Sequence, residues 1–248
     1  MENNKISFYK NFKFCFFSRN GGVSKDHQYR SLNCSKSSKD KRSFIKKNRL
    51  LVSDYFKSKK KKIFVNQIHS NKVVFVNNSH TEIVNADGMI TNRKDIDLGI
   101  LTADCAPVII FGKENYGIIH AGWKGAFNGI IKKTLEKFDS MGEEIHELSI
   151  YIGPHLKKES FEVQPNFLKI LKKFKINDQK YVFLLNKKIF FNFTKFLTDQ
   201  INIFEVKKIY VSKIDTFKNP ENYFSYRYYL KKGIKNCGRQ MSLVGIKE

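Results

Sequence analysis

The stretch LTADCAPVIIFGKENYGIIHAGWKG, residues 101–125, decides the centre of the fold. Its two apolar runs are separated by the turn residues GKEN at 112–115, which is the pattern of a β-hairpin. If the two residues flanking this turn lie opposite each other, then Pro107 lies opposite His120. Cys105 is then the diagonal neighbour of His120 on the same face, with the two α-carbons about 7 to 8 Å apart. The sequence therefore predicts that both side chains can reach one ion or one substrate.

The rest of the chain mixes strand and helix patterns. Short apolar runs bounded by Asn, Gly and Lys predict strands at 63–69, 72–76, 99–111, 148–153, 206–212 and 241–246. Apolar residues at helical spacing predict helices at 123–138, 165–173 and 192–204, and a surface helix in the Lys-rich segment 36–62 with residues 50–52, 55 and 56 on one side. Because the strands come in runs with helices interspersed irregularly, we expect an α+β fold with mixed β-sheets rather than a doubly wound parallel one. A chain of 248 residues is expected to form a single domain over 1–248.

The charge of the chain is strongly positive, at +23, from 46 Lys and Arg against 23 Asp and Glu. Hydrophobic residues make up 41% and aromatic residues 14%, which is too much apolar material for a disordered polycation. Only seven of the basic residues are Arg, whereas a nucleic-acid reader is expected to use Arg freely for bidentate contacts. Nucleic-acid binding is therefore an unfavoured alternative, and the positive field is expected to draw anionic substrates.

The sequence shows no apolar run of roughly 18 residues and no signal-peptide pattern, so we expect a cytoplasmic protein that does not span a membrane. The four cysteines, at 15, 34, 105 and 237, have no CxxC spacing and are expected as free thiols. We expect the chain to be a monomer.

Three potential metal ligands, His69, Cys105 and His120, each stand at the margin of an apolar run. Two imidazoles and one thiolate with an open fourth position match the ligand set of a catalytic zinc. The glycines after His120 leave the backbone bare for a ligand, and the start of the following helix favours anions. However, their spacings match no short metal motif, and a structural His with an inert buried Cys explains the same residues. Spacing alone leaves both interpretations open.

Motifs along the whole chain carry a resemblance to a known family. Besides VNQIHSNKV, TADC and HAGWKG, they are SRNGGVS (18–24), SLN (31–33), NRLL (48–51), ADGMIT (86–91), IGPHLKKESFEV (152–163), FSYR (224–227) and GRQMSLVG (238–245). In this order they resemble the YfiH family, also called the laccase-domain or polyphenol-oxidase family, which includes the peptidoglycan editing factor. One departure is Asp215-Thr216, where many relatives carry a Cys-Thr pair.

The resemblance implies a single α+β domain with a zinc site formed by His69, Cys105 and His120. It also implies a purine nucleoside phosphorylase, acting on a purine nucleoside and phosphate, that deaminates adenosine and cleaves methylthioadenosine. An amidohydrolase that edits cell-wall precursors is the alternative. A copper oxidase is disfavoured because multicopper sites need many His and the chain has six.

Six further residues are predicted to bind substrate. They are Asn33, Arg49, Gln67, Asp104, Glu162 and Arg227. The two arginines suit phosphate, although a structural ion pair explains them equally well. The amides suit ribose hydroxyls or the base, and Glu162 suits a hydroxyl, although each could cap a turn instead. Asp104 is expected to support a ligand imidazole or to relay protons.

Overall fold

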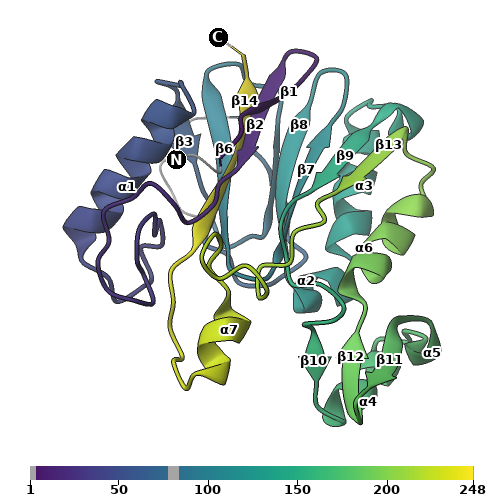
Figure 1. Ribbon diagram of the computed structural model, residues 1–248. Coiled ribbons are helices and arrows are strands. Elements are labelled where there is room, and N and C mark those ends of the chain that lie inside the picture. The colour runs from purple at the N-terminus through teal and green to yellow at the C-terminus, as the bar shows by residue number, and fades with distance from the viewer. Residues whose placement is uncertain (1–3, 78–83, 248) are drawn as a thin grey trace.

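The computed structural model describes residues 4–77 and 84–247. Two β-sheets face each other, and helices cover their outer sides (Figure 1). One sheet has the order β13 (Lys208–Val211), β9 (Ser149–Ile152), β7 (Ala106–Phe111), β8 (Tyr116–Ala121), β5 (Gly88–Thr91), β4 (Val73–Phe75). The other has the order β1 (Ser7–Tyr9), β2 (Phe12–Phe16), β14 (Gln240–Ile246), β6 (Ile96–Thr102), β3 (Lys61–Ile63). A small third sheet consists of β10 (Glu162–Val163), β12 (Lys188–Phe191) and β11 (Val182–Leu185).

Both large sheets combine parallel and antiparallel neighbours. The pairs β13–β9, β4–β5 and β3–β6 are parallel, whereas β7 is antiparallel to both β8 and β9. The predicted α+β fold with mixed sheets is therefore confirmed.

The strand β7 shows how the sequence builds the two layers of the core. Ile109 and Phe111 face the second sheet, while Val108 and Ile110 face the helices, as the period of two along a strand requires. All six residues of this strand are buried because both faces are covered, which is why the strand is a continuous apolar run in the sequence.

Helices pack on the outer faces of the two sheets. The helices are α1 (Arg42–Tyr55), α2 (Trp123–Phe127), α3 (Ile130–Ser140), α4 (Asn166–Lys173), α5 (Asp178–Tyr181), α6 (Phe193–Asn202), α7 (Tyr226–Lys231) and a short 3-10 helix at Ile145–Glu147. Helix α1 lies at one side of Figure 1, against the five-stranded sheet, and α3 and α6 lie at the other. Among the described residues, no helix is long and apolar enough to cross a membrane.

The predicted hairpin is confirmed. In the register of β7 and β8, Pro107 lies opposite His120. The side chain of Glu143 holds the turn between the strands, since its two oxygens accept hydrogen bonds from the backbone N–H groups of Lys113, Glu114 and Asn115 at 2.6 to 2.9 Å.

Two predicted elements are interrupted where the backbone turns left-handed. The helix predicted at 123–138 is wrong as one piece, because it divides into α2 and α3 at Gly129, whose φ is 81°. The run 99–111 divides into β6 and β7 around Asp104, whose φ is 82°. The spacing of apolar residues continues through Gly129 and Asp104, so this spacing did not indicate that the elements end there.

Other differences come from tertiary contacts. The strand predicted at 63–69 is wrong beyond Ile63, because residues 64–69 leave the sheet and form the loop that carries His69. Leu50 is 56% exposed and does not lie on the buried side of α1, which consists of Ile45, Asn48 and Val52. The strands β1, β2 and β5, the small third sheet and α7 were not predicted.

Candidate metal centre and cavity

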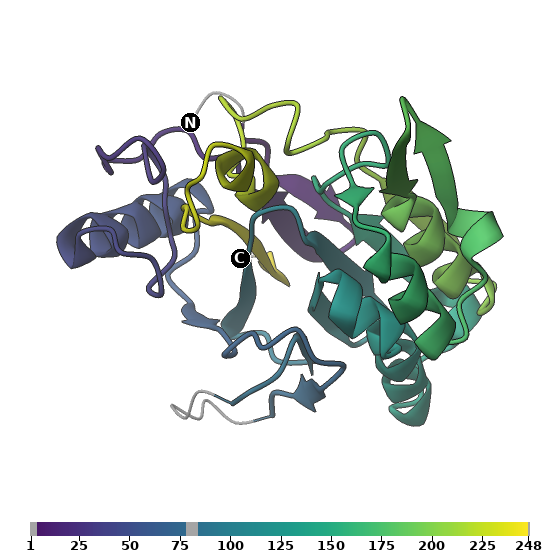
Figure 2. The ribbon, with the colours of Figure 1, turned by 90° about the horizontal axis from the view of Figure 1, so that it is seen from below.

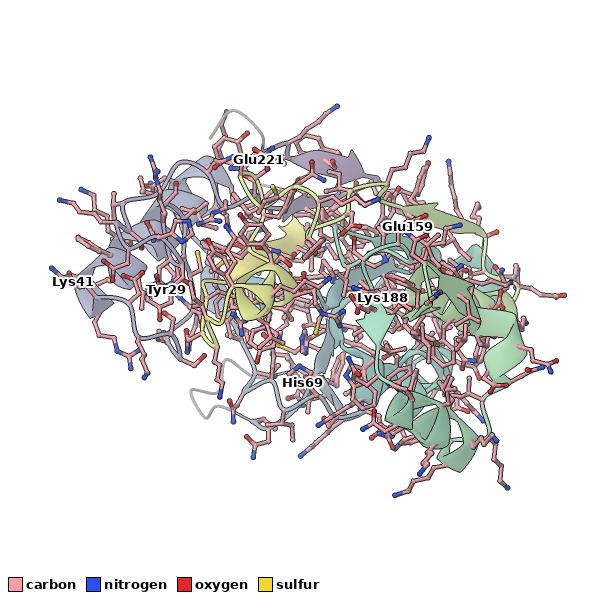
Figure 3. All side chains as sticks on the ribbon, turned by 60° about the horizontal axis from the view of Figure 1, so that its bottom comes forward. Tyr29, Lys41, His69, Glu159, Lys188 and Glu221 are labelled. Atoms are coloured by element: carbon pink, nitrogen blue, oxygen red, sulfur yellow. The ribbon has the colours of Figure 1, made fainter. Side chains whose placement is uncertain are left out.

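The side chains of His69, Cys105 and His120 meet at one point. Their ligand atoms all lie within 4.8 Å of one another. The Sγ atom of Cys105 is 3.8 Å from Nε2 of His69, and the two imidazole rings lie 4.7 Å apart at 76°. His120 belongs to β8, Cys105 precedes β7, and His69 lies in the loop between β3 and β4. Figure 3 places His69 on the face that is turned toward the viewer from the bottom of Figure 1.

Asp87, just before β5, holds two of these residues in place. Its Oδ1 contacts Nδ1 of His120 at 2.8 Å and accepts the backbone N–H of His69 at 3.0 Å. Its Oδ2 accepts the hydroxyl of Ser70 at 2.8 Å. Burial opposes ionisation of this carboxyl group, but the hydrogen bonds from His120 and Ser70 prevail and lower its pKa to about 2. This role was not predicted from the sequence, although a charged residue directly before the apolar run GMIT was a usable signal.

Gly122 gives His69 the space to reach the other two ligands. A β-carbon at this position would lie 2.7 Å from Cδ2 of His69 and 3.2 Å from Sγ of Cys105. The bare backbone after His120 thus accommodates a protein side chain rather than an external ligand. The expected anion site at the start of a long helix also loses its basis, because α2 has five residues.

The three residues fit a metal ion. In a tetrahedral zinc site, a sulfur and a nitrogen ligand lie about 3.6 Å apart, close to the separation of Cys105 and His69. Because Asp87 contacts Nδ1 of His120, Nε2 of this ring is left to face the cluster, as in the carboxylate–histidine pairs of metal sites. Burial opposes ionisation of the Cys105 thiol, but His120 and His69 lower its pKa to about 6, which favours the ligating thiolate.

The cluster lies in the wall of a cavity of about 880 Å³. Trp123, Phe161 and Phe193 form an aromatic part of the lining. Four of the six predicted substrate-binding residues also line the cavity: Arg49, Gln67, Asp104 and Arg227. Arg239 is a further lining residue that the sequence analysis did not single out, although it lies in the GRQMSLVG motif.

Asn33 and Glu162 lie outside the cavity lining. Asn33 is fully buried, and its side chain hydrogen-bonds Ser38, Asp40 and the backbone N–H groups of Ser35 and Arg239. The carboxylate of Glu162 pairs with Lys231 at 2.9 Å and Lys188 at 3.4 Å. Both side chains therefore have structural partners. Turn capping fits Asn33, which accepts the N–H of Ser35 two residues on, whereas Glu162 is held by ion pairs.

Gln67 and Asp104 line the cavity but are held by the protein itself. The amide of Gln67 makes two hydrogen bonds with the backbone of Leu101, at 2.8 and 2.9 Å, and so ties the loop before His69 to β6. Asp104 accepts the Thr216 hydroxyl at 2.7 Å and the backbone N–H of Arg227 at 2.6 Å. The imidazole support expected of Asp104 comes from Asp87 instead, because Asp104 points toward α7.

The two predicted arginines do not form ion pairs. Nε of Arg49 donates to the carbonyl oxygen of Cys34 at 2.9 Å, and its guanidinium lies 4.5 Å from the centre of the Phe64 ring. Nη1 of Arg227 donates to the carbonyl oxygen of Glu162 at 2.6 Å. No carboxylate of the described residues lies within ion-pair distance of either guanidinium, in contrast to Arg93 with Asp95. The structural ion pair considered above is therefore wrong for both.

Two similar proteins share one name, and two solved structures share the fold of this chain. A Rickettsia prowazekii protein named purine nucleoside phosphorylase is 31% identical over 180 residues, which are 71% of this chain and 74% of that protein. A Borreliella burgdorferi protein with the same name is 33% identical over 195 residues, 75% of this chain and 84% of that protein. The crystal structure of a Neisseria meningitidis protein superposes with a TM-score of 0.86 at 24% identity, covering 99% of this chain and 100% of that one. The structure of Bacillus licheniformis YfiH gives 0.87 at 23% identity, covering 96% and 94%.

The family assignment rests on almost the whole chain. The family described as multi-copper polyphenol oxidoreductase laccase matches residues 13–247. This range contains the His69, Cys105 and His120 cluster and every residue of the cavity lining. The chain therefore belongs to this laccase-domain family, the YfiH family that its motifs resemble.

Proposed function

We propose that the protein is a zinc-dependent purine nucleoside phosphorylase. The observation that carries the proposal is the cluster of His69, Cys105 and His120 in the wall of a cavity lined by arginines. Relatives named purine nucleoside phosphorylase support it. The copper-oxidase name of the family finds less support, because the described part of the chain contains one cluster of three or more potential ligands, and its thiolate and imidazoles suit zinc.

The proposed reaction joins a phosphate oxygen to C1′ of the ribose while the bond from C1′ to the purine breaks. His69, Cys105 and His120 hold zinc, which supplies a Lewis acid for a substrate oxygen when bound. Arg227 binds phosphate, since its guanidinium lines the cavity and Glu162 fixes one of its nitrogens through a carbonyl oxygen. Trp123 and Phe161, aromatic residues of the cavity lining, are the proposed apolar contacts of the purine.

The proposal includes phosphorolysis of methylthioadenosine and deamination of adenosine in the same cavity. Methylthioadenosine differs from adenosine at the 5′ position, away from the bond that breaks. Deamination needs a carboxyl group to carry protons, and Asp104 is the carboxyl residue among those that line the cavity.

The test is release of hypoxanthine and ribose 1-phosphate from inosine and phosphate. We expect activity in the wild type and a loss of at least about 100-fold in Cys105→Ala, because the variant lacks a ligand. Cys15→Ala is the matched control, since it removes a buried thiol outside the cavity. Absence of base release in the wild type, or equal rates in Cys105→Ala and wild type, contradicts the proposal. Ammonia release from adenosine tests deamination separately.

Metal analysis tests the cofactor independently of activity. We expect one zinc per chain in the purified wild type and loss of that zinc in His120→Ala. Stoichiometric copper in its place would refute the zinc assignment and support the oxidase name.

A further inference from the structure

Arginine is concentrated at the cavity. Three of the seven arginines of the chain, Arg49, Arg227 and Arg239, line it. Four lysines, Lys36, Lys61, Lys62 and Lys124, also line it, but they are four of the 39 lysines of the chain, so the share of arginine at the cavity exceeds that of lysine. Phosphorolysis needs a site for one inorganic phosphate, and three arginines exceed that need.

Two of these arginines are joined through a single short segment, residues 33–37. Nε of Arg49 donates to the carbonyl oxygen of Cys34 at 2.9 Å. The backbone carbonyl of Arg239 accepts the N–H of Cys34 at 3.1 Å, and the N–H of Arg239 donates to Oδ1 of Asn33 at 3.0 Å. Cys34 therefore contacts both arginines, and the buried Asn33 beside it holds the backbone of Arg239.

The same segment adds hydroxyl groups to the cavity lining. Ser35 and Ser37 both line it, and their Oγ atoms lie 3.0 Å apart. Guanidinium groups together with serine hydroxyls are the donors that bind phosphate oxygens. Nη1 of Arg239 donates to the carbonyl oxygens of Cys237 and Gly238 at 2.7 and 3.0 Å, as Nε of Arg49 does to Cys34. These neutral acceptors leave the positive charge of both groups uncompensated, and no acidic side chain among the described residues pairs with either, so an anion from solution can do so.

Arg227 belongs to a different wall. It lies in α7 and is held by the carbonyl oxygens of Ser160 and Glu162 and by Asp104. In Figures 1 and 2, α7 lies between α1, which carries Arg49, and the small sheet that contains β10. Through Asp104 it is also adjacent to the metal ligand Cys105. Arg227 is thus placed for the reacting phosphate, whereas the Arg49 and Arg239 pair is available for another anion.

We propose that Arg49, Arg239, Ser35 and Ser37 form a second anion subsite, which binds a phosphate group carried by the substrate itself. The substrate class is then a purine nucleoside monophosphate. The nucleoside part of this inference rests on the proposed function, while the phosphate part rests on the contacts described above.

The test compares the dissociation constants of inosine and inosine 5′-phosphate by titration calorimetry. We expect the wild type to bind inosine 5′-phosphate at least about tenfold more tightly, since charge-assisted contacts to phosphate are strong. Arg239→Gln and Ser35→Ala should reduce this preference. Arg30→Gln is the matched control, because it removes the same charge from an exposed position outside the cavity lining and should keep the preference.

Equal affinity of the wild type for the two ligands overturns the subsite. So does loss of the preference in Arg227→Gln with retention in Arg239→Gln, because the ligand phosphate would then occupy the other arginine. An equal loss in Arg30→Gln also overturns it, since the preference would come from the overall charge. These outcomes concern binding, so they are distinct from a failure of the proposed function, which appears as absence of hypoxanthine release.

Discussion

Asp87 is the residue that connects the cluster of His69, Cys105 and His120 to the fold. It contacts the imidazole of His120 and the backbone of His69, two residues that are 51 positions apart in the sequence. Because one buried carboxylate fixes both, the geometry of the cluster depends on a residue that is not itself a ligand.

Replacing Asp87 with Asn is expected to weaken metal binding about 10- to 100-fold. In the wild type, the hydroxyl and the backbone N–H of Ser70 both donate to Oδ2 of Asp87. The amide of Asn keeps one acceptor oxygen for His120 and His69, but it presents an N–H group to these two donors of Ser70. Competition for zinc with a chromophoric chelator measures the effect. Asp95→Asn is the control, because Asp95 is exposed and pairs with Arg93. Equal affinity of Asp87→Asn and wild type would show that Asp87 does not support the site.

At the level of single residues, the sequence analysis identified the three residues of the cluster but not their support. His and Cys residues can be recognised as potential metal ligands from the sequence. The contacts of Asp87, in contrast, depend on where the loop after β3 lies in the folded protein. Asn33 and Glu162 were predicted to bind substrate, but their polar groups contact other residues of the protein instead.

Among the elements, the hairpin of β7 and β8 was the most predictable. A turn of four residues and the period of two along a strand are local properties, so they placed Pro107 opposite His120 before any tertiary contact was known. The helix after the hairpin was less predictable, because the left-handed backbone at Gly129 interrupts the helix while the apolar residues keep their helical spacing.

Replacing Glu143 with Gln is expected to destabilise the protein by about 1 to 3 kcal/mol at pH 7, because charge-assisted hydrogen bonds to the hairpin turn are lost. Burial opposes ionisation of Glu143, but the turn N–H groups of Lys113, Glu114 and Asn115, with the Asn115 side chain, lower its pKa. A lowered folded-state pKa stabilises the protein above the ordinary glutamate pKa, and this contribution is lost as the pH falls through the lowered value.

Urea unfolding of wild type and Glu143→Gln at pH 7 and at decreasing pH measures this contribution. The difference between the two proteins should shrink in acid. Glu136→Gln is a suitable control, since Glu136 is exposed and pairs only with Lys132 of the same helix among its described contacts. If the difference in unfolding free energy between the two proteins stays constant with pH, the negative charge of Glu143 does not account for its stabilising role.

For the whole molecule, the net charge of +23 is distributed mainly as exposed lysine. The three arginines at the cavity are a small part of this charge, and each guanidinium group is held by backbone carbonyl oxygens. Four lysines also line the cavity, among them Lys62, which pairs with Asp97 at 3.4 Å. Most of the lysines lie outside the cavity lining, so their effect can be tested separately from that of the residues in the cavity.

Changing Lys169, Lys172 and Lys173 of α4 to Gln should leave kcat/KM for inosine within about twofold at physiological salt. These side chains are exposed and outside the cavity lining, and salt screens such charges beyond about 8 Å. Steady-state kinetics of the triple variant beside wild type measure the effect. A loss of more than about tenfold would contradict this prediction. It would mean that these lysines take a direct part in catalysis, because screened long-range attraction is too weak to explain such a loss.

The sequence by itself determined the fold class, the register of the central hairpin and the approach of Cys105 to His120, because strand alternation and turn residues act over short distances along the chain. The family resemblance implied that His69 joins them, but only the tertiary structure decided how it does so, through Asp87 and the space at Gly122. It also decided that α1, α7 and the segment before β14 bring three arginines to one cavity. These contacts join residues far apart in sequence, and their geometry follows from how the two sheets and their helices pack, which no local pattern encodes.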